Sequence, residues 1–110
     1  MPTRFIHDGN SIDYTPGSAV TAGDVIVQGE LVGIAKRDIA ANALGSLAVE
    51  GVFDFPKATG AGTAITAGAN VYWNAGAGQA TTTSAGNKLI GKTTKAAADA
   101  DATVCARLAQ

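Results

Sequence analysis

Apolar residues recur at every second position in several short stretches of the chain, which is the spacing of a half-buried β-strand. The clearest stretch runs from Ser46 to Phe55, where Leu47, Val49, Phe53 and Phe55 would share one face. Valine, isoleucine and threonine are frequent throughout, and these residue types favour strands over helices. The pattern therefore predicts a β-protein with a strand over residues 46–55.

Two of the apolar stretches form a recognisable pair. Residues 24–28 and 31–35 flank Gly29-Glu30, and two apolar runs around a short glycine turn are typical of a β-hairpin. A polar loop is expected over residues 36–38. Further strands are predicted at residues 11–15, 70–74, 79–83 and 103–108.

Helical signals are confined to two alanine-rich segments. Residues 39–44 have the composition for about one helical turn, and residues 95–102 also contain good helix formers. Neither segment has a large apolar stripe with which to pack against a core, and short isolated helices are marginal in water. We expect short helical turns or loops at these places.

One sequence pattern occurs twice. Residues 20–27, VTAGDVIV, resemble residues 65–73, ITAGANVYW, with one residue inserted. Each copy begins with an apolar residue, continues through a Thr-Ala-Gly turn and leads into a strand. Two readings are open: both copies are ordinary turn–strand units, or the chain contains an internal duplication.

Composition indicates a thin core. The 110 residues suit one domain, and 46% of them are hydrophobic. However, 23 of these are alanine, and only 27 are larger aliphatic or aromatic residues. Cys105 is the single cysteine, so the core has no internal disulfide to support it. We therefore expect self-association to supply additional burial.

The charge pattern excludes several classes of function. Charged residues make up 15% of the chain, and their formal sum is −1, so no basic field is available to hold nucleic acid. No apolar run approaches the roughly 20 residues of a membrane-spanning helix. The N-terminal residues lack the apolar segment of a signal peptide. We expect synthesis in a cytoplasm, with no membrane or nucleic-acid partner.

Residues 86–93, GNKLIGKT, match the pattern of a phosphate-binding loop. Such a loop needs a strand before it and a substantial helix after it, and only 17 residues follow Thr93. Leu89 and Ile90 look instead like part of a buried strand. Gly91 is then expected at a bulge or a close backbone contact. No nucleotide binding is predicted.

No catalytic, cofactor-binding or metal-binding residue is predicted. His7 is the only histidine, and nothing in its spacing to Asp8, Ser11 or Ser18 indicates a catalytic triad. One histidine and one cysteine cannot build a zinc site. The carboxylates of Asp99 and Asp101 are too few for calcium.

Two groups of apolar residues are candidates for partner binding. Phe5 and Ile6, followed by His7, stand in an otherwise polar N-terminal arm and are too few to form a core of their own. We predict that this arm is mobile and docks on a partner or a neighbouring subunit. Tyr72 and Trp73 stand between small residues. They would form a partner or glycan surface, or else one ring lies in the core and the other at its rim.

Several segments, in order, resemble a family of small capsid cement (decoration) proteins from bacteriophages and prophages. These segments are residues 5–15, residues 20–29, the run GVFDFPK at residues 51–57, and residues 90–91 and 103–108 near the C-terminus. Members of this family are often labelled RecA/RadA-type phage recombinases. The lookalike at residues 86–93 shows how such a label can arise.

The resemblance implies a homotrimer that binds the major capsid protein on the outside of a phage head and reinforces the shell. The protein would be made in the cytoplasm of a host bacterium and would reside on the virion exterior. An alternative is another phage-associated β-module, for tail or baseplate attachment or glycan binding. An enzyme or recombinase is the third possibility.

We therefore expect an all-β fold, a small single-domain β-barrel or β-tulip-like sandwich with short loops and at most one or two short helical turns. Residues 1–15 would form the N-terminal arm and first strand, and residues 16–110 a single β-rich domain. The predicted partner-binding residues are Phe5, Ile6, His7, Tyr72 and Trp73.

Overall fold

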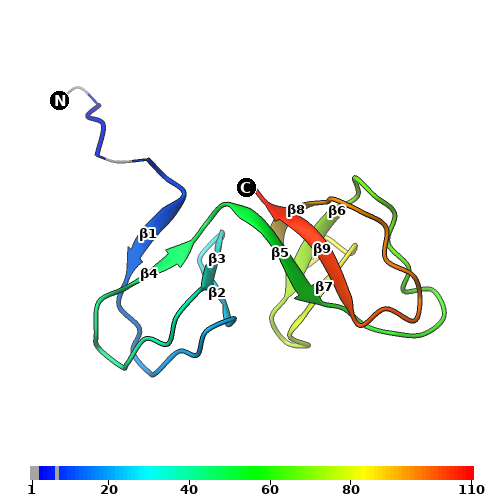
Figure 1. Ribbon diagram of the computed structural model, residues 1–110, viewed down its shortest axis with the longest axis horizontal. Helices are drawn as coiled ribbons and strands as arrows, with labels where there is room; N and C mark the ends of the chain where they lie inside the picture. The colour runs from blue at the N-terminus through cyan, green and yellow to red at the C-terminus, as the bar shows by residue number, and fades with distance from the viewer. Residues whose placement is uncertain (1–2, 7) are drawn as a thin grey trace.

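The computed structural model describes residues 3–6 and 8–110, and these residues form two antiparallel β-sheets (Figure 1). The first sheet has four strands in the order β1-β4-β3-β2. Its strands are β1 (Ser11–Tyr14), β2 (Val25–Gln28), β3 (Leu31–Ala35) and β4 (Gly45–Ala48). The expected hairpin is confirmed, because β2 pairs with β3 and Gln28 lies opposite Leu31 across the turn.

The second sheet has five strands in the order β5-β9-β8-β6-β7. Its strands are β5 (Gly51–Pro56), β6 (Asn70–Asn74), β7 (Gln79–Thr81), β8 (Lys88–Thr93) and β9 (Thr103–Leu108). The strand expected over residues 103–108 is confirmed as β9, and its alternate residues Val104, Ala106 and Leu108 are buried.

The expected fold class is confirmed: the described residues form an all-β sandwich without helices. An isolated parallel bridge between Lys57 and Ala80 brings the end of β5 beside β7. No continuous ladder joins these two edges in the described chain, so the second sheet is not a closed barrel. The alanine-rich segments at 39–44 and 95–102 form turns and isolated bridges.

The single strand expected over residues 46–55 is wrong. The chain forms β4 and β5 there, in different sheets, with a bend between them. Gly51 has a φ of 127°, a conformation that side-chain-bearing residues rarely adopt. Figure 1 shows the chain arching at this point from the first sheet to the second. The apolar alternation continues through the bend, so periodicity alone does not reveal it.

Two apolar clusters hold the sandwich together. The larger cluster joins one face of the first sheet, including Val32 and Ile34, to the inner face of the second, including Phe55 and Leu108. The smaller cluster, Val20, Ala35, Ile39 and Leu47, lies on the other face of the first sheet. Residues from the loops beside β2 and β3 therefore cover that face.

The repeated sequence pattern has the same structure in both copies. In the first copy, Val20 bridges to Ile39, and the Gly23 N–H donates to the carbonyl of Ala35 at 2.6 Å. In the second copy, the corresponding Ile65 bridges to Ala97, and the Gly68 N–H donates to the carbonyl of Thr93 at 2.9 Å.

The strand order repeats as well. In the first sheet it is β1-β4-β3-β2, and in the second β5-β9-β8-β6, with β7 added at the edge. The equivalent strands are thus β1 and β5, β4 and β9, β3 and β8, and β2 and β6. The sequence pattern, the hydrogen bonds and the topology together favour internal duplication over two unrelated turn–strand units.

Candidate functional site

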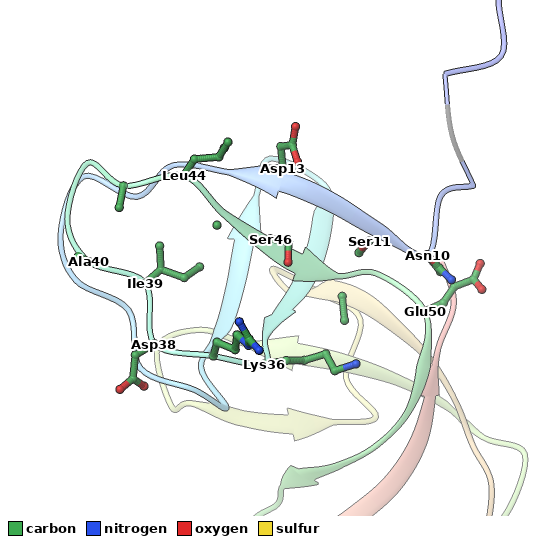
Figure 2. Close-up of a pocket in the computed structure, with 14 residues that line it drawn as sticks. Asn10, Ser11, Asp13, Lys36, Asp38, Ile39, Ala40, Leu44, Ser46 and Glu50 are labelled. Atoms are coloured by element: carbon green, nitrogen blue, oxygen red, sulfur yellow. The ribbon is translucent and has the colours of Figure 1, made fainter.

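A large open hollow lies on the first sheet, at its outer edge (Figure 2). It has a volume of about 730 Å³. The loop of residues 36–44 forms one side of it, and β1 and β4 form its floor and the other side. Leu44, which is 72% exposed, is a large apolar side chain at its rim.

Charges of both signs surround this hollow. Lys36 lines one side, and Asp13 and Glu50 line the side formed by β1 and the end of β4 (Figure 2). Arg37 also lines the hollow. Asp38 also lines it, but one oxygen of its carboxylate accepts a hydrogen bond from the N–H of Ala22 at 2.8 Å. An open hollow with mixed charge suits contact with a protein surface better than enclosure of a small molecule.

The described part of the N-terminal arm, residues 3–6 and 8–10, leads away from the body of the molecule (Figure 1). Phe5 is 81% exposed and Ile6 is 72% exposed, so neither side chain contributes to the core. His7, the third residue predicted for this site, lies outside the described residues. The base of the arm, at Asn10, lies at the edge of the large hollow.

Tyr72 and Trp73 are neighbours on β6 and point to opposite faces of the sheet. Trp73 is 8% exposed and packs in the core against Phe55, with ring centroids 6.3 Å apart. Tyr72 is half-buried on the outer face. The two rings do not form a shared exposed surface, and a partner role for them stays a prediction.

The segment that resembles a phosphate loop is the strand β8. The N–H of Thr93 donates to the carbonyl of Ala69 at 2.9 Å, and the Thr93 hydroxyl donates to the carbonyl of Thr66 at 2.6 Å. Ladder hydrogen bonds occupy backbone that a phosphate loop would leave free. Lys92 is exposed on the outer face. This geometry does not match a nucleotide site.

Gly91 is the close backbone contact that the sequence predicts. A Cβ at this position would overlap the carbonyl oxygen of Arg107 and lie 3.0 Å from the backbone nitrogen of Ala109. The pairing of β6 with β8 also shifts register between Val71 and Tyr72. This bulge places Ile90 in the core but leaves Leu89 37% exposed, so the expectation that both are buried is wrong for Leu89.

The candidate carboxylates and the cysteine have local structural partners. The Asp99 carboxylate accepts hydrogen bonds from the N–H groups of Thr63 and Ala64, at 3.1 and 2.8 Å. Asp101 accepts one from the N–H of Ala98 at 2.8 Å. Cys105 is half-buried, and its sulfur accepts a hydrogen bond from the Thr94 hydroxyl at 3.1 Å. Within residues 3–6 and 8–110, no group of three metal-ligating side chains forms.

Sequence reasoning missed Lys57, which is 4% exposed. Its ammonium donates to the carbonyls of Ala58 and Asp101 at 2.8 and 2.9 Å, and it lies 3.3 Å from the hydroxyl of Thr63. The side chain thereby ties together the loops that follow β5 and β8. A lysine directly after Pro56 gives no sign in the sequence that it is buried, because both loops must fold first.

Helices capable of crossing a bilayer do not occur in the described part of the chain.

Comparison with protein families gives one informative result. A family model described as phage cement protein matches residues 6–108. No curated protein and no solved structure gives a significant match. The family description refers to a structural role and gives no support to the recombinase label. Since the match spans nearly all of the chain and the all-β fold agrees with the resemblance noted in the sequence, the chain belongs to the phage cement protein family.

Proposed function

We propose that this cement protein binds the outer surface of a phage head, contacts the major capsid protein and stabilises the shell. The observation that carries the proposal is the N-terminal arm, whose two large apolar side chains, Phe5 and Ile6, are exposed and make no part of the core. Exposed apolar anchors next to a polar body are typical of a surface made for protein contact. The arm gives up conformational entropy when it docks.

We further infer that the protein acts as a homotrimer and has no enzymatic activity. Support for self-association comes from the small number of large apolar residues and from the absence of a disulfide, which leave a thin core. The protein would be made in the bacterial cytoplasm and would reside on the virion exterior. The alternative glycan-binding module is less well supported, because the Trp73 ring is buried.

Binding to purified capsids tests the proposal. The wild-type protein should sediment with capsids, and Phe5→Ala should weaken that binding while the thermal stability of the free protein stays unchanged. Thr3→Ala, an exposed polar change in the same arm, is the matched control and should bind like wild type. If Phe5→Ala binds capsids as tightly as Thr3→Ala does, the arm is not the anchor.

A further inference from the structure

The internal duplication makes two rows of residues equivalent, one across each sheet. Each row crosses four strands in the same order, and its members lie directly opposite one another in register. The row in the first sheet is Val25, Ile34, Ala48 and Ser11. The row in the second sheet is Asn70, Lys92, Arg107 and Val52.

The two rows have opposite environments. In the first sheet, Ile34 and Ala48 are 5% and 6% exposed and belong to the cluster that joins the two sheets. In the second sheet, the equivalent Lys92 and Arg107 are exposed, and Val52 at the end of the row is 57% exposed. The face with which the first sheet packs against the second sheet is therefore equivalent to a face of the second sheet that is open to solvent.

The open row carries two unneutralised positive charges. Lys92 lies directly opposite Arg107, and like charges in this position destabilise a strand pair. Asp54 follows Val52 on the same face of β5, opposite Cys105, but it forms no ion pair with Lys92 or Arg107. The ion pair found among the described residues is Lys88–Glu30. Neither Lys92 nor Arg107 has an ion-pair partner in the described structure, which leaves both charges available for an external contact.

The row also surrounds a small hollow that could receive a side chain. A hollow of about 110 Å³ lies beside Gly91, with Lys92, Arg107 and Leu89 among the lining residues. Leu89 is 37% exposed. The outer face of the second sheet thus combines two cations, a recess and exposed apolar side chains. We call Lys92 and Arg107, with the adjoining Leu89 and Val52, the basic row.

A complementary surface exists on the same chain. Asp13 and Glu50 line the β1 side of the large hollow, make no ion pair in the described structure, and share that hollow with the exposed Leu44 (Figure 2). We call Asp13, Glu50 and Leu44 the acidic rim. Lys36 and Asp38 lie across the hollow from Asp13 and Glu50 (Figure 2), and Arg37 also lines it, so Asp13 and Glu50 form a separate acidic stretch beside β1.

We propose that the basic row of one copy docks on the acidic rim of a second copy. This inference rests on the self-association put forward under the proposed function and specifies the surfaces that make the contact. Two different surfaces meet, so the contact runs head to tail, and such contacts form a ring when the rotation closes. In a homotrimer each copy would use both surfaces once.

Charge reversal followed by analytical ultracentrifugation tests the proposal. One variant combines Lys92→Glu with Arg107→Glu, a second combines Asp13→Lys with Glu50→Lys, and a third carries all four changes. Each of the first two should raise the concentration at which trimers form by at least tenfold, and the third should return to the wild-type value. Lys95→Glu, at an exposed position outside the arm and both surfaces, is the single-charge control and should remain trimeric, whereas Lys92→Glu, the same charge change inside the basic row, should weaken assembly.

The outcomes separate this inference from the proposed trimer. A monomeric wild type at micromolar concentration overturns both. A trimeric wild type whose basic-row variant is also trimeric overturns only the docking surface. A basic-row variant that dissociates but is not rescued by the acidic-rim changes overturns the pairing of these two surfaces. If the double reversal in the basic row fails to fold, Lys92→Glu alone, which faces Arg107 with opposite charge, should fold and still weaken assembly.

Discussion

Replacing Lys57 by methionine should destabilise the free protein by about 2–3 kcal/mol. The methionine keeps most of the aliphatic stem but removes the ammonium that donates to the carbonyls of Ala58 and Asp101. Both hydrogen bonds are partly buried. Leaving a buried acceptor without its donor costs about 1–3 kcal/mol, and the lower part of that range applies to each of these two carbonyls. The Thr63 hydroxyl contributes little, since it lies 3.3 Å from the ammonium and also donates to the carbonyl of Gly60 at 2.6 Å.

The Lys57→Met effect is measured by thermal and urea unfolding. For a domain of this size, the loss corresponds to a fall in Tm of roughly 10 °C. Hydrogen exchange should also rise selectively in the loops of residues 58–64 and 98–102, because Lys57 joins them. Lys95→Met, at an exposed position, is the matched control and should change stability by less than about 0.5 kcal/mol.

A Lys57→Met protein as stable as Lys95→Met would refute this reasoning. Replacement of a complete buried ion pair by apolar residues is often neutral, because both polar partners leave together. Here the carbonyl acceptors stay in place, which is why a loss is expected. A neutral result would mean that water reaches those carbonyls as soon as the ammonium is removed.

Three other substitutions give further tests. Gly91→Ala should cost more than about 3 kcal/mol or prevent folding, because its Cβ would overlap the Arg107 carbonyl, and urea titration measures this. Trp73→Ala should cost about 3–5 kcal/mol, as for a buried aromatic ring in a core, whereas a near-neutral value would place the ring on the surface. Phe5→Ala should leave the unfolding free energy within about 0.5 kcal/mol of wild type, and a large loss would show that the arm is part of the core.

Local patterns in the sequence predict the strands that pair with near neighbours. The hairpin of β2 and β3 follows from two apolar runs around Gly29-Glu30, and the alternation in β9 shows directly which residues face the core. The close contact at Gly91 also has a local signal, a glycine beside apolar strand residues. These features depend on turn chemistry and on a period of two, both of which are visible in one segment.

Features that depend on distant segments could not be predicted in the same way. The break between β4 and β5 leaves the alternation of residues 46–55 intact, and only the change of partner strand, from β3 to β9, reveals it. The exposure of Leu89 follows from a bulge that involves β6. The hollow beside β1 forms where the loop of residues 36–44 meets the edge of the sheet, and none of its lining residues is unusual in sequence.

The internal duplication could be predicted from the sequence only in part. The Thr-Ala-Gly motif marks both copies in the sequence, but the equivalence of Ile34 with Lys92 becomes clear only from strand register. An apolar residue and a lysine do not look like counterparts. Their different surroundings explain the difference, because one packs between the sheets and the other faces outward.

Sedimentation of the purified protein with DNA-filled heads that lack their cement protein tests the central claim most directly. We predict saturable binding to the outer surface of the heads, together with an increase in the temperature at which they release DNA. Heads that bind no protein, or that bind it without any gain in thermal stability, would contradict the proposal that this chain reinforces the shell.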